Sequence, residues 1–181
     1  MLRKNTQDDG TLLKTSIPLH LDFAKKRRQE NEIHFAQVVR LIKFWTAKEK
    51  RESATGEFRF KSFMIEMILS HLSDEGCDFS DYPEALQTFF TYLATSNMRE
   101  KIIFPDYYDP NKAGSFSDPI QIVDPVNEEN NVGRLYTDKN IELIVGAAID
   151  AGDAIDSALA ATTKEKTVYY WQKVFGSSFQ G

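Results

Sequence analysis

The stretch FRFKSFMIEMILSHL, residues 58–72, decides the fold of this chain. Its apolar residues recur at spacings of three and four, which is the period of an α-helix with one buried face. The members of that face are Phe60, Phe63, Met64, Met67, Ile68 and Leu72. The sequence therefore predicts a core helix here, with the polar pair Lys61 and Ser62 at its entry.

Two more helices are predicted on the N-terminal side of this stretch. Residues 31–51 carry one apolar stripe, formed by Phe35, Val38, Val39, Ile42 and Trp45. Residues 15–31 form a helix opened by Ser16 as N-cap, with Pro18 in its first turn. The first ten residues are polar, and no regular structure is expected there.

Three further helices are predicted toward the C-terminus. After Asp81, a helix buries Tyr82, Leu86, Phe89, Phe90 and Leu93. After Asp138, a longer helix places on one face Ile141, Ile144, Val145, Ala148, Ile155 and Leu159. In the last helix, Thr162 and Glu165 are spaced as a capping box, and Gly176 is the stop signal.

The region between the helix that follows Asp81 and the helix that follows Asp138 has a different composition. It contains two short extended runs, 102–104 and 120–123, among many Pro, Gly, Asp and Asn residues. We interpret it as a loop-rich insert with one short β-strand pair. The predicted fold class is therefore mainly α, a helical bundle with a loop-rich insert.

Composition limits the classes of function. The chain has 181 residues, enough for one domain or one lobe of a two-lobed protein, and 41% are hydrophobic, enough for a real core. Its net charge is −5, which argues against wrapping a nucleic-acid duplex. The basic run KKRR, residues 25–28, is accordingly interpreted as a solvated helix face rather than a nucleic-acid sensor.

The single cysteine, Cys77, excludes an internal disulfide framework and a cysteine-based zinc site. No apolar run is long enough to cross a bilayer, and the N-terminus lacks the apolar block of a signal peptide. We therefore expect a cytoplasmic protein without a membrane partner.

Catalytic and metal-binding motifs are absent from the sequence. The three histidines have no metal-ligand spacing, and no GxSxG, Walker A or Rossmann motif occurs. The segment AGSFSD, residues 113–118, lacks a second glycine and an adjoining helix and is interpreted as a turn. No two aspartates form a D-x-D pair, so no catalytic residue and no metal ligand is predicted in this chain.

Three residues have both a structural and a ligand-binding interpretation. Lys43 can extend to solvent or project a charge toward phosphates. Ser62 can cap a helix or donate a hydrogen bond to a phosphate oxygen. Phe63 can fill the core or present its ring to a purine base. Residue types alone leave these alternatives open.

The order of the motifs resembles a known family. The motifs that carry this similarity are, in order, VVRLIKFW, KSFMIEMIL, an aromatic helix, IQIVDPVNEENNVG and a long helix. With these motifs, the chain is similar to the C-terminal helical lobe of bacterial cyclic-oligonucleotide synthases (CD-NTases). These enzymes act in anti-phage signalling (CBASS) and are relatives of oligoadenylate synthetases and cyclic GMP-AMP synthase. The resemblance extends from TSIPLHLDFAKKRR to the last helix.

This resemblance implies a two-lobed, template-independent nucleotidyltransferase that uses ATP or GTP. An N-terminal lobe carries a Gly-Ser loop and a carboxylate triad that holds Mg²⁺, while the C-terminal lobe closes the nucleotide pocket. Matching the motifs one by one gives the nucleotide-binding positions that the resemblance implies. Lys43 and Ser62 would contact the triphosphate, and Phe63 would stack on the base. Many relatives have Tyr at the position of Phe63; the phenylalanine of this chain preserves stacking but lacks the hydroxyl that would form a hydrogen bond.

The same resemblance places the Asp124-Pro125 turn and Asn130–Asn131 in a loop after a strand. We interpret them as structural, because Asp and Asn side chains fix turns by bonding to nearby backbone groups.

The family's catalytic lobe should lie upstream of Thr15. We expect residues 1–14 to be a linker or a remnant of that lobe, and residues 15–181 to be the C-terminal helical lobe. Three arrangements stay open at this point: a truncated synthase, half of a split enzyme whose N-terminal catalytic lobe is a separate partner, and a non-catalytic remnant. The alternative function is a helical interaction module that pairs with a partner chain.

Overall fold

The computed structural model describes residues 3–6, 12–28 and 32–180. Its helices are α1 (Ile17–Arg28), α2 (Glu32–Glu52), α3 (Ser62–Asp74), α4 (Tyr82–Ser96), α5 (Asp138–Leu159) and α6 (Lys164–Phe175). Its strands are β1 (Arg3–Thr6), β2 (Leu12–Thr15), β3 (Lys101–Ile102), β4 (Gln121–Asp124) and β5 (Asn127–Asn131). A short 3-10 helix, Pro110–Lys112, lies in the loop between β3 and β4.

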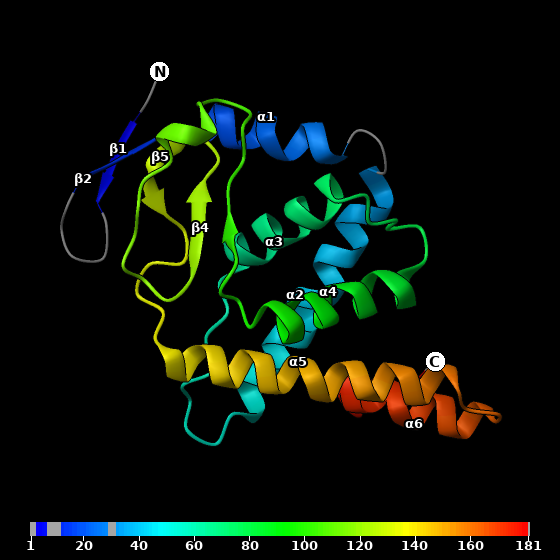
Figure 1. The fold of residues 1–181 in the computed structure, drawn as a ribbon. Coiled ribbons are helices and arrows are strands. Elements are labelled where there is room, and N and C mark those ends of the chain that lie inside the picture. The colour runs from blue at the N-terminus through cyan, green and yellow to red at the C-terminus, as the bar shows by residue number, and fades with distance from the viewer. Residues whose placement is uncertain (1–2, 7–11, 29–31, 181) are drawn as a thin grey trace.

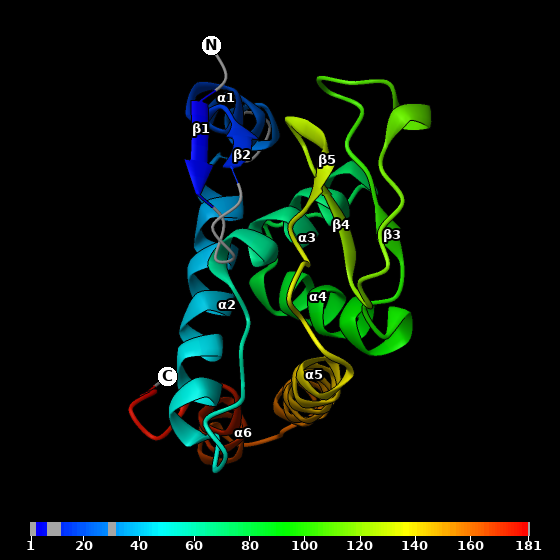
Figure 2. The same cartoon turned by 90° about the vertical axis from the view of Figure 1, so that its left-hand side faces the viewer.

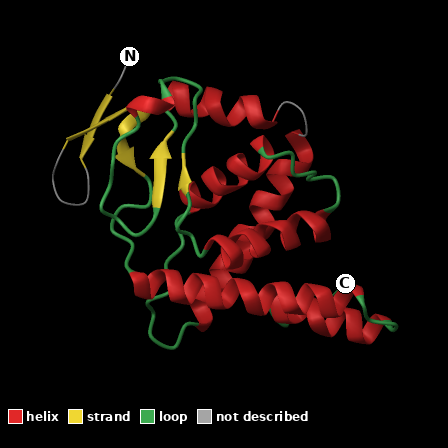
Figure 3. Ribbon diagram, viewed as in Figure 1, coloured by secondary structure: helices red, strands yellow, loops and turns green. Residues whose placement is uncertain are grey.

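The helices form a bundle with the strands gathered at one side (Figure 3). Helix α2 runs from α1 at one end of the molecule to the antiparallel pair α5 and α6 at the other (Figure 2). Helices α3 and α4 lie between α1 and α5 (Figure 1). The mainly α architecture expected from the sequence is confirmed, and a small three-stranded sheet belongs to it.

The helical stripes pack into one hydrophobic core. The α2 stripe is buried as predicted, and Trp45 is among the largest fully buried side chains. The ring of Phe90 from α4 meets Trp45 at 4.8 Å between centroids in an edge-on contact. Aromatic pairs in this geometry add to the gain from burial, so this contact helps to fix α4 on α2.

The quoted stretch is only partly helical. Helix α3 begins at Ser62, while residues 57–61 have no regular secondary structure and Lys61 is extended, so the predicted helical position of Phe60 is wrong. In that segment buried and unburied residues alternate. Phe58 and Phe60 are buried, whereas Arg59 and Lys61 are not. Alternation with a period of two is the pattern of extended backbone, and both rings pack on Trp45.

Helix boundaries confirm most of the predicted caps. The predicted N-cap Ser16 accepts through Oγ from Leu19 N–H at 3.4 Å. Asp81, for which no capping role was predicted, also caps its helix by accepting from Glu84 N–H at 3.1 Å. The predicted capping box of the last helix is wrong, because Thr163 is the N-cap and accepts from Lys166 N–H. Gly176 ends that helix with φ 90°, as expected.

Three predicted side-chain environments are also wrong. Phe63, assigned to the buried face of its helix, is 37% exposed. Leu159, assigned to the buried face of its helix, is 60% exposed because it is the last residue of α5. Arg27, assigned to a solvated face, has a side chain that is only 9% exposed. Its guanidinium lies 2.7 Å from Asp74 and 2.8 Å from Asp106, and so joins α1 to α3 and to the insert.

The insert contains one more strand than expected. Strands β3 and β4 pair in parallel, which confirms the predicted contact of the two extended runs. Strand β5 adds antiparallel to β4, although its sequence NEENN gave no strand signal. Polar side chains hold this hairpin, as predicted: Asp124 Oδ1 accepts from Val126 N–H at 2.9 Å, and Asn131 Oδ1 accepts from Ile122 N–H at 3.0 Å.

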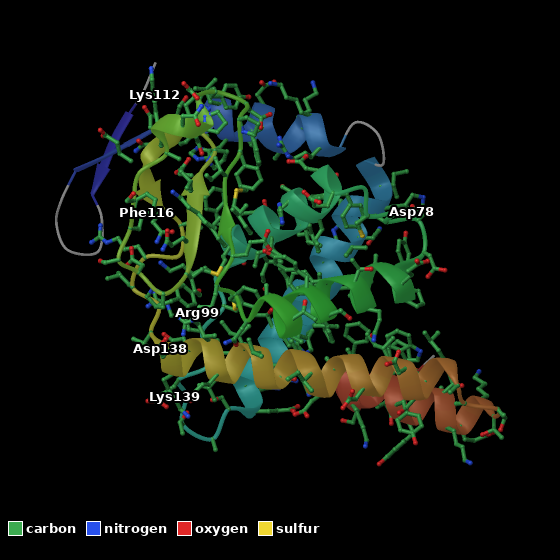
Figure 4. All side chains as sticks on the ribbon, in the orientation of Figure 1. Asp78, Arg99, Lys112, Phe116, Asp138 and Lys139 are labelled. Carbon is green, nitrogen blue, oxygen red and sulfur yellow. The ribbon has the colours of Figure 1, made fainter. Side chains whose placement is uncertain are left out.

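The insert is also connected to the helices at its start. Arg99, just before β3, donates to the Asp138 carboxylate at the first residue of α5 (Figure 4). This contact joins the two ends of the insert, because Asp138 follows its last loop.

Strands β1 and β2 form an antiparallel hairpin, with Arg3 opposite Thr15. No regular structure was expected for residues 3–6, so that expectation is wrong for their backbone. The assignment of residues 1–14 to a linker or remnant stays a prediction. None of the helices in the described ranges is long and apolar enough to cross a membrane.

Candidate functional site

Lys43 lies on α2 and reaches the first turns of α3. Its Nζ is 2.6 Å from Glu66 Oε1, and the two side chains are 35% and 25% exposed. Glu66 follows Ser62 by one helical turn, so it lies on the same face of α3 as Ser62. The ammonium of Lys43 is therefore beside the exposed N-terminal face of α3.

The N-terminus of α3 lacks the usual side-chain cap. Lys61 is the N-cap residue, and its side chain makes no capping hydrogen bond. Ser62 is the first helical residue and is exposed, so the alternative that Ser62 caps this helix is wrong. Backbone N–H groups and the helix dipole make such a terminus favourable for an anion.

Tyr136 fixes where α3 begins. Its hydroxyl accepts from Lys61 N–H at 2.8 Å, and burial raises the pKa of this phenol. Arg59 lies 5.2 Å from the centre of the same ring. The loop before α5 therefore holds the entry of α3 in place.

Phe63 is only partly in the core. The residue is 37% exposed, whereas the next residue, Met64, is fully buried. The imidazole of His20 on α1 lies 5.4 Å from it between ring centroids, at 76°. Phe63 thus presents part of its ring to solvent, while His20 supports it from one side.

His20 is itself bound from two directions. Its Nε2 lies 2.8 Å from Asp124 Oδ1, and its Nδ1 lies 3.0 Å from the carbonyl oxygen of Ser16. The Asp124 side chain is 3% exposed. The insert, α1 and α3 therefore meet at His20.

The surface made by Lys43, Ser62, Phe63, His20 and Glu66 offers an ammonium, a hydroxyl, an exposed aromatic residue, an imidazole that is bonded to Asp124, and a carboxylate. This set suits a ligand with both an anionic and an aromatic part. It does not suit Mg²⁺, which prefers several oxygen ligands. Throughout residues 3–6, 12–28 and 32–180, no group of three or more His, Cys, Asp or Glu side chains is placed to hold a metal.

A separate groove of about 660 Å³ lies between α2, α5 and α6. Charged residues line it, including Lys48, Glu49 and Asp153, but Lys43, Ser62 and Phe63 do not. It is therefore distinct from the surface at the N-terminus of α3.

The structure brings together the three residues singled out in the sequence. It adds Glu66 and His20, which sequence reasoning missed. Glu66 could have been found from the sequence, because it follows Ser62 by four residues and therefore lies on the same face of a helix. Nothing in the sequence indicates His20, because its partner Asp124 is 104 residues away along the chain.

Two kinds of known protein are similar to this chain. A cyclic AMP-AMP-AMP synthase of Escherichia coli (strain MS 115-1) is 60% identical over 176 residues, which are 97% of this chain and 54% of that protein. A CBASS oligonucleotide cyclase CdnC of Escherichia coli (strain KTE188) is 29% identical over 172 residues, 95% of this chain and 50% of that protein. This chain is similar over nearly its whole length to about half of a cyclic AMP-AMP-AMP synthase and, more distantly, to about half of a CBASS oligonucleotide cyclase.

Solved structures of a cyclase agree with this similarity. The structure of E. coli MS115-1 CdnC with ATP superposes with a TM-score of 0.95 and 57% identity, covering 99% of this chain and 56% of that one. The complex of the same CdnC with HORMA-deltaN superposes with a TM-score of 0.92 and 60% sequence identity. The match covers 95% of this chain and 54% of the CdnC chain. No family model matches the chain. The chain spans about half the length of the curated relatives it matches.

Proposed function

We propose that this chain is the nucleotide-binding helical lobe of a template-independent nucleotidyltransferase that makes a cyclic oligonucleotide in anti-phage defence. The observation that carries the proposal is the surface at the start of α3, where Lys43 pairs with Glu66 one turn after the exposed Ser62 and Phe63. Homology to a cyclic AMP-AMP-AMP synthase supports it.

In this proposal the anionic part of the ligand is a triphosphate. Lys43 neutralises phosphate charge, and Ser62 donates its hydroxyl hydrogen to a phosphate oxygen. The uncapped N-terminus of α3 adds backbone N–H groups to the same anion. A lysine ammonium has three donors, so Lys43 can keep Glu66 and still bind phosphate.

The base stacks on Phe63. Stacking needs an accessible aromatic ring, and Phe63 is a 37% exposed residue. Such stacking is tolerant of base identity, because every base has a π-face. We propose ATP as the ligand because a cyclase similar to this chain was solved with ATP. GTP is the alternative that stacking alone permits.

The joining of nucleotides requires groups that this surface does not offer. Lys43, Ser62 and Phe63 bind and orient the nucleotide, and Mg²⁺ is held in this proposal by carboxylates of a catalytic lobe. We accordingly expect the chain by itself to bind ATP without converting it to a cyclic product.

Binding of two ligands by substituted chains tests the assignment. Inorganic tripolyphosphate carries the charge of ATP without a base, so it separates the two halves of the site. Phe63→Ala should weaken ATP about 5- to 150-fold and leave tripolyphosphate unchanged, because only stacking is lost. Lys43→Ala should weaken both ligands about tenfold or more, because a charge-assisted contact is lost. Isothermal titration calorimetry gives both dissociation constants.

Matched controls come from the same chain. Phe44→Ala removes a half-exposed ring that packs near Phe175, and Lys139→Ala removes an exposed ammonium on α5 (Figure 4). Both should bind ATP as the unsubstituted chain does. If Lys43→Ala and Phe63→Ala leave ATP affinity unchanged, the site is wrongly assigned.

A second candidate function is an interaction module. Ile17 and Leu21 lie one turn apart on α1 and are 52% and 66% exposed, which is unusual for apolar residues that have no partner. The solved complex of CdnC with HORMA-deltaN shows that a protein similar to this chain has a protein partner. Failure of the chain to bind ATP would favour this function.

A further inference from the structure

His20 occupies a position that the nucleotide-binding residues do not explain. It belongs to α1, yet its imidazole contacts Asp124 of β4 and the ring of Phe63 at the start of α3. Its side chain is 18% exposed and that of Asp124 is 3% exposed. A polar side chain at the junction of three segments, in contact with the proposed base platform, can control how that platform is oriented.

The hydrogen bonds of His20 define its charge. The Ser16 carbonyl, 3.0 Å from Nδ1, can only accept, so Nδ1 must donate. Asp124 Oδ1, 2.8 Å from Nε2, also accepts from the Val126 N–H, as a carboxylate oxygen does. Nε2 must therefore donate as well. A ring that donates from both nitrogens is an imidazolium.

The surroundings agree with this charge state. Burial lowers the pKa of His20, but the hydrogen bond and charge of Asp124 and the carbonyl of Ser16 outweigh it and leave the pKa raised. Asp124 faces the ring from β4, Ser16 from the start of α1, and the uncharged Phe63 from α3.

The contact with Phe63 transmits this arrangement to the site. The two rings stand at 76° with centroids 5.4 Å apart, an edge-on geometry that is favourable for aromatic pairs. Phe63 lies in the first turn of α3 and is 37% exposed, so fewer core atoms restrain its ring than restrain Met64. An imidazolium fixed at two points is a rigid support for such a ring.

We propose that His20, held between Asp124 and Ser16, is a positioning residue that orients Phe63 for stacking on the nucleotide base. This inference rests on the proposed function, because it requires Phe63 to be the base platform. It assigns Asp124 a second role: beyond fixing its turn, this carboxylate connects the insert to the nucleotide-binding surface.

The role predicts a pH dependence that belongs to the base and not to the phosphates. When His20 loses a proton, one ring nitrogen becomes an acceptor that faces another acceptor, and one of its two fixing contacts is lost. ATP affinity should then fall relative to tripolyphosphate affinity as pH rises. The ratio of the two dissociation constants is the readout, because protonation of phosphate oxygens affects both ligands.

The experiment compares the chain with His20→Gln at about pH 6 and about pH 8.5, on either side of the ordinary histidine range. In the unsubstituted chain the ratio should shift against ATP by about two- to tenfold at the higher pH, the usual effect of one aromatic contact. In His20→Gln the ratio of the two dissociation constants should be shifted against ATP already at the lower pH, and it should not change further at the higher pH. His34→Gln, whose imidazole contacts Tyr82 instead, should behave as the unsubstituted chain does.

A double substitution separates positioning from general structural damage. If His20 acts through Phe63, adding His20→Gln to Phe63→Ala should not change ATP affinity further. If the added substitution weakens ATP as strongly as it does alone, the positioning role is wrong. Circular dichroism establishes that each variant is folded before binding is measured.

The outcomes distinguish this inference from the proposed function. If Phe63→Ala weakens ATP while His20→Gln keeps both the affinity and the pH dependence of the unsubstituted chain, His20 is not a positioning residue and the proposed function stands. If Phe63→Ala and Lys43→Ala have no effect on ATP, or if the chain does not bind ATP, both are overturned.

Discussion

Glu66 sets the charge of the candidate surface at the scale of single residues. It lies one turn after Ser62, and its carboxylate is 2.6 Å from Lys43 Nζ. Because both side chains are partly exposed, water screens this ion pair and its contribution to stability is small. Its larger effect is expected on the ligand, since a carboxylate here repels an incoming phosphate.

Glu66→Gln should therefore tighten the binding of tripolyphosphate about three- to tenfold, because one repulsive charge is removed while a side chain of the same shape stays. Calorimetric titration gives the dissociation constant. Glu49→Gln is the control, since Glu49 also pairs with a lysine on α2, at 2.8 Å from Lys48. Weaker binding by Glu66→Gln would show instead that Glu66 holds Lys43 in its binding position.

At the scale of elements, the helix N-termini whose caps the structure describes differ in how they are capped. Asp81, Thr137 and Thr163 each cap a helix through a side-chain oxygen. Helix α3 has no such cap, and the hydroxyl of Tyr136 binds Lys61 N–H just before it. In each capped helix a side-chain oxygen of the chain occupies one N–H of the first turn, whereas at the start of α3 no capping side chain takes an N–H that a ligand could use.

Asp81→Ala should lower the free energy of unfolding by about 1 kcal/mol, because α4 loses the acceptor of Glu84 N–H. Urea denaturation measures this difference. The control is Asp156→Ala, the same replacement at an exposed position within α5, which should change stability by less than about 0.5 kcal/mol. Equal losses in both variants would contradict the capping role.

At the scale of the whole molecule, the insert and the helices are joined by ionic contacts at several points. Arg27 of α1 binds Asp106 of the insert at 2.8 Å, and His20 of α1 binds Asp124 at 2.8 Å. Arg99 binds Asp138 at the opposite end of the insert. Of these groups, the histidine has the ordinary pKa closest to neutrality. In His20 burial lowers that pKa, but the hydrogen bond and charge of Asp124 outweigh it and leave the pKa raised, so His20 makes the attachment of α1 to the insert sensitive to pH.

The pKa of His20 is raised in the folded chain, so folding favours its protonated form. The resulting stabilisation is fully present below the unfolded pKa of about 6.5 and is lost as pH rises through the folded pKa. Thermal unfolding should therefore show Tm falling over this window, and the fall should be smaller in His20→Gln. An identical fall in both chains would assign it to other groups.

The sequence by itself determined the helices. Helical spacing of apolar residues and local caps depend on neighbours within one or two turns, so they identified α2, α4 and the buried face of α3 before any tertiary contact was known. The same local signals failed where two patterns overlap: Phe58 and Phe60 alternate as in a strand, and Phe60 also fits the helical period of α3.

Only the tertiary structure decided the surroundings of the candidate site. Motif order indicated Lys43, Ser62 and Phe63, but not the carboxylate on Lys43 or the imidazole beside Phe63. Strand β5 was missed for a related reason, because its polar residues pair with β4 through backbone and with buried acceptors through side chains. The partner of a polar group is chosen by packing between distant segments, and the 104 residues between His20 and Asp124 leave no local pattern from which that choice could be read.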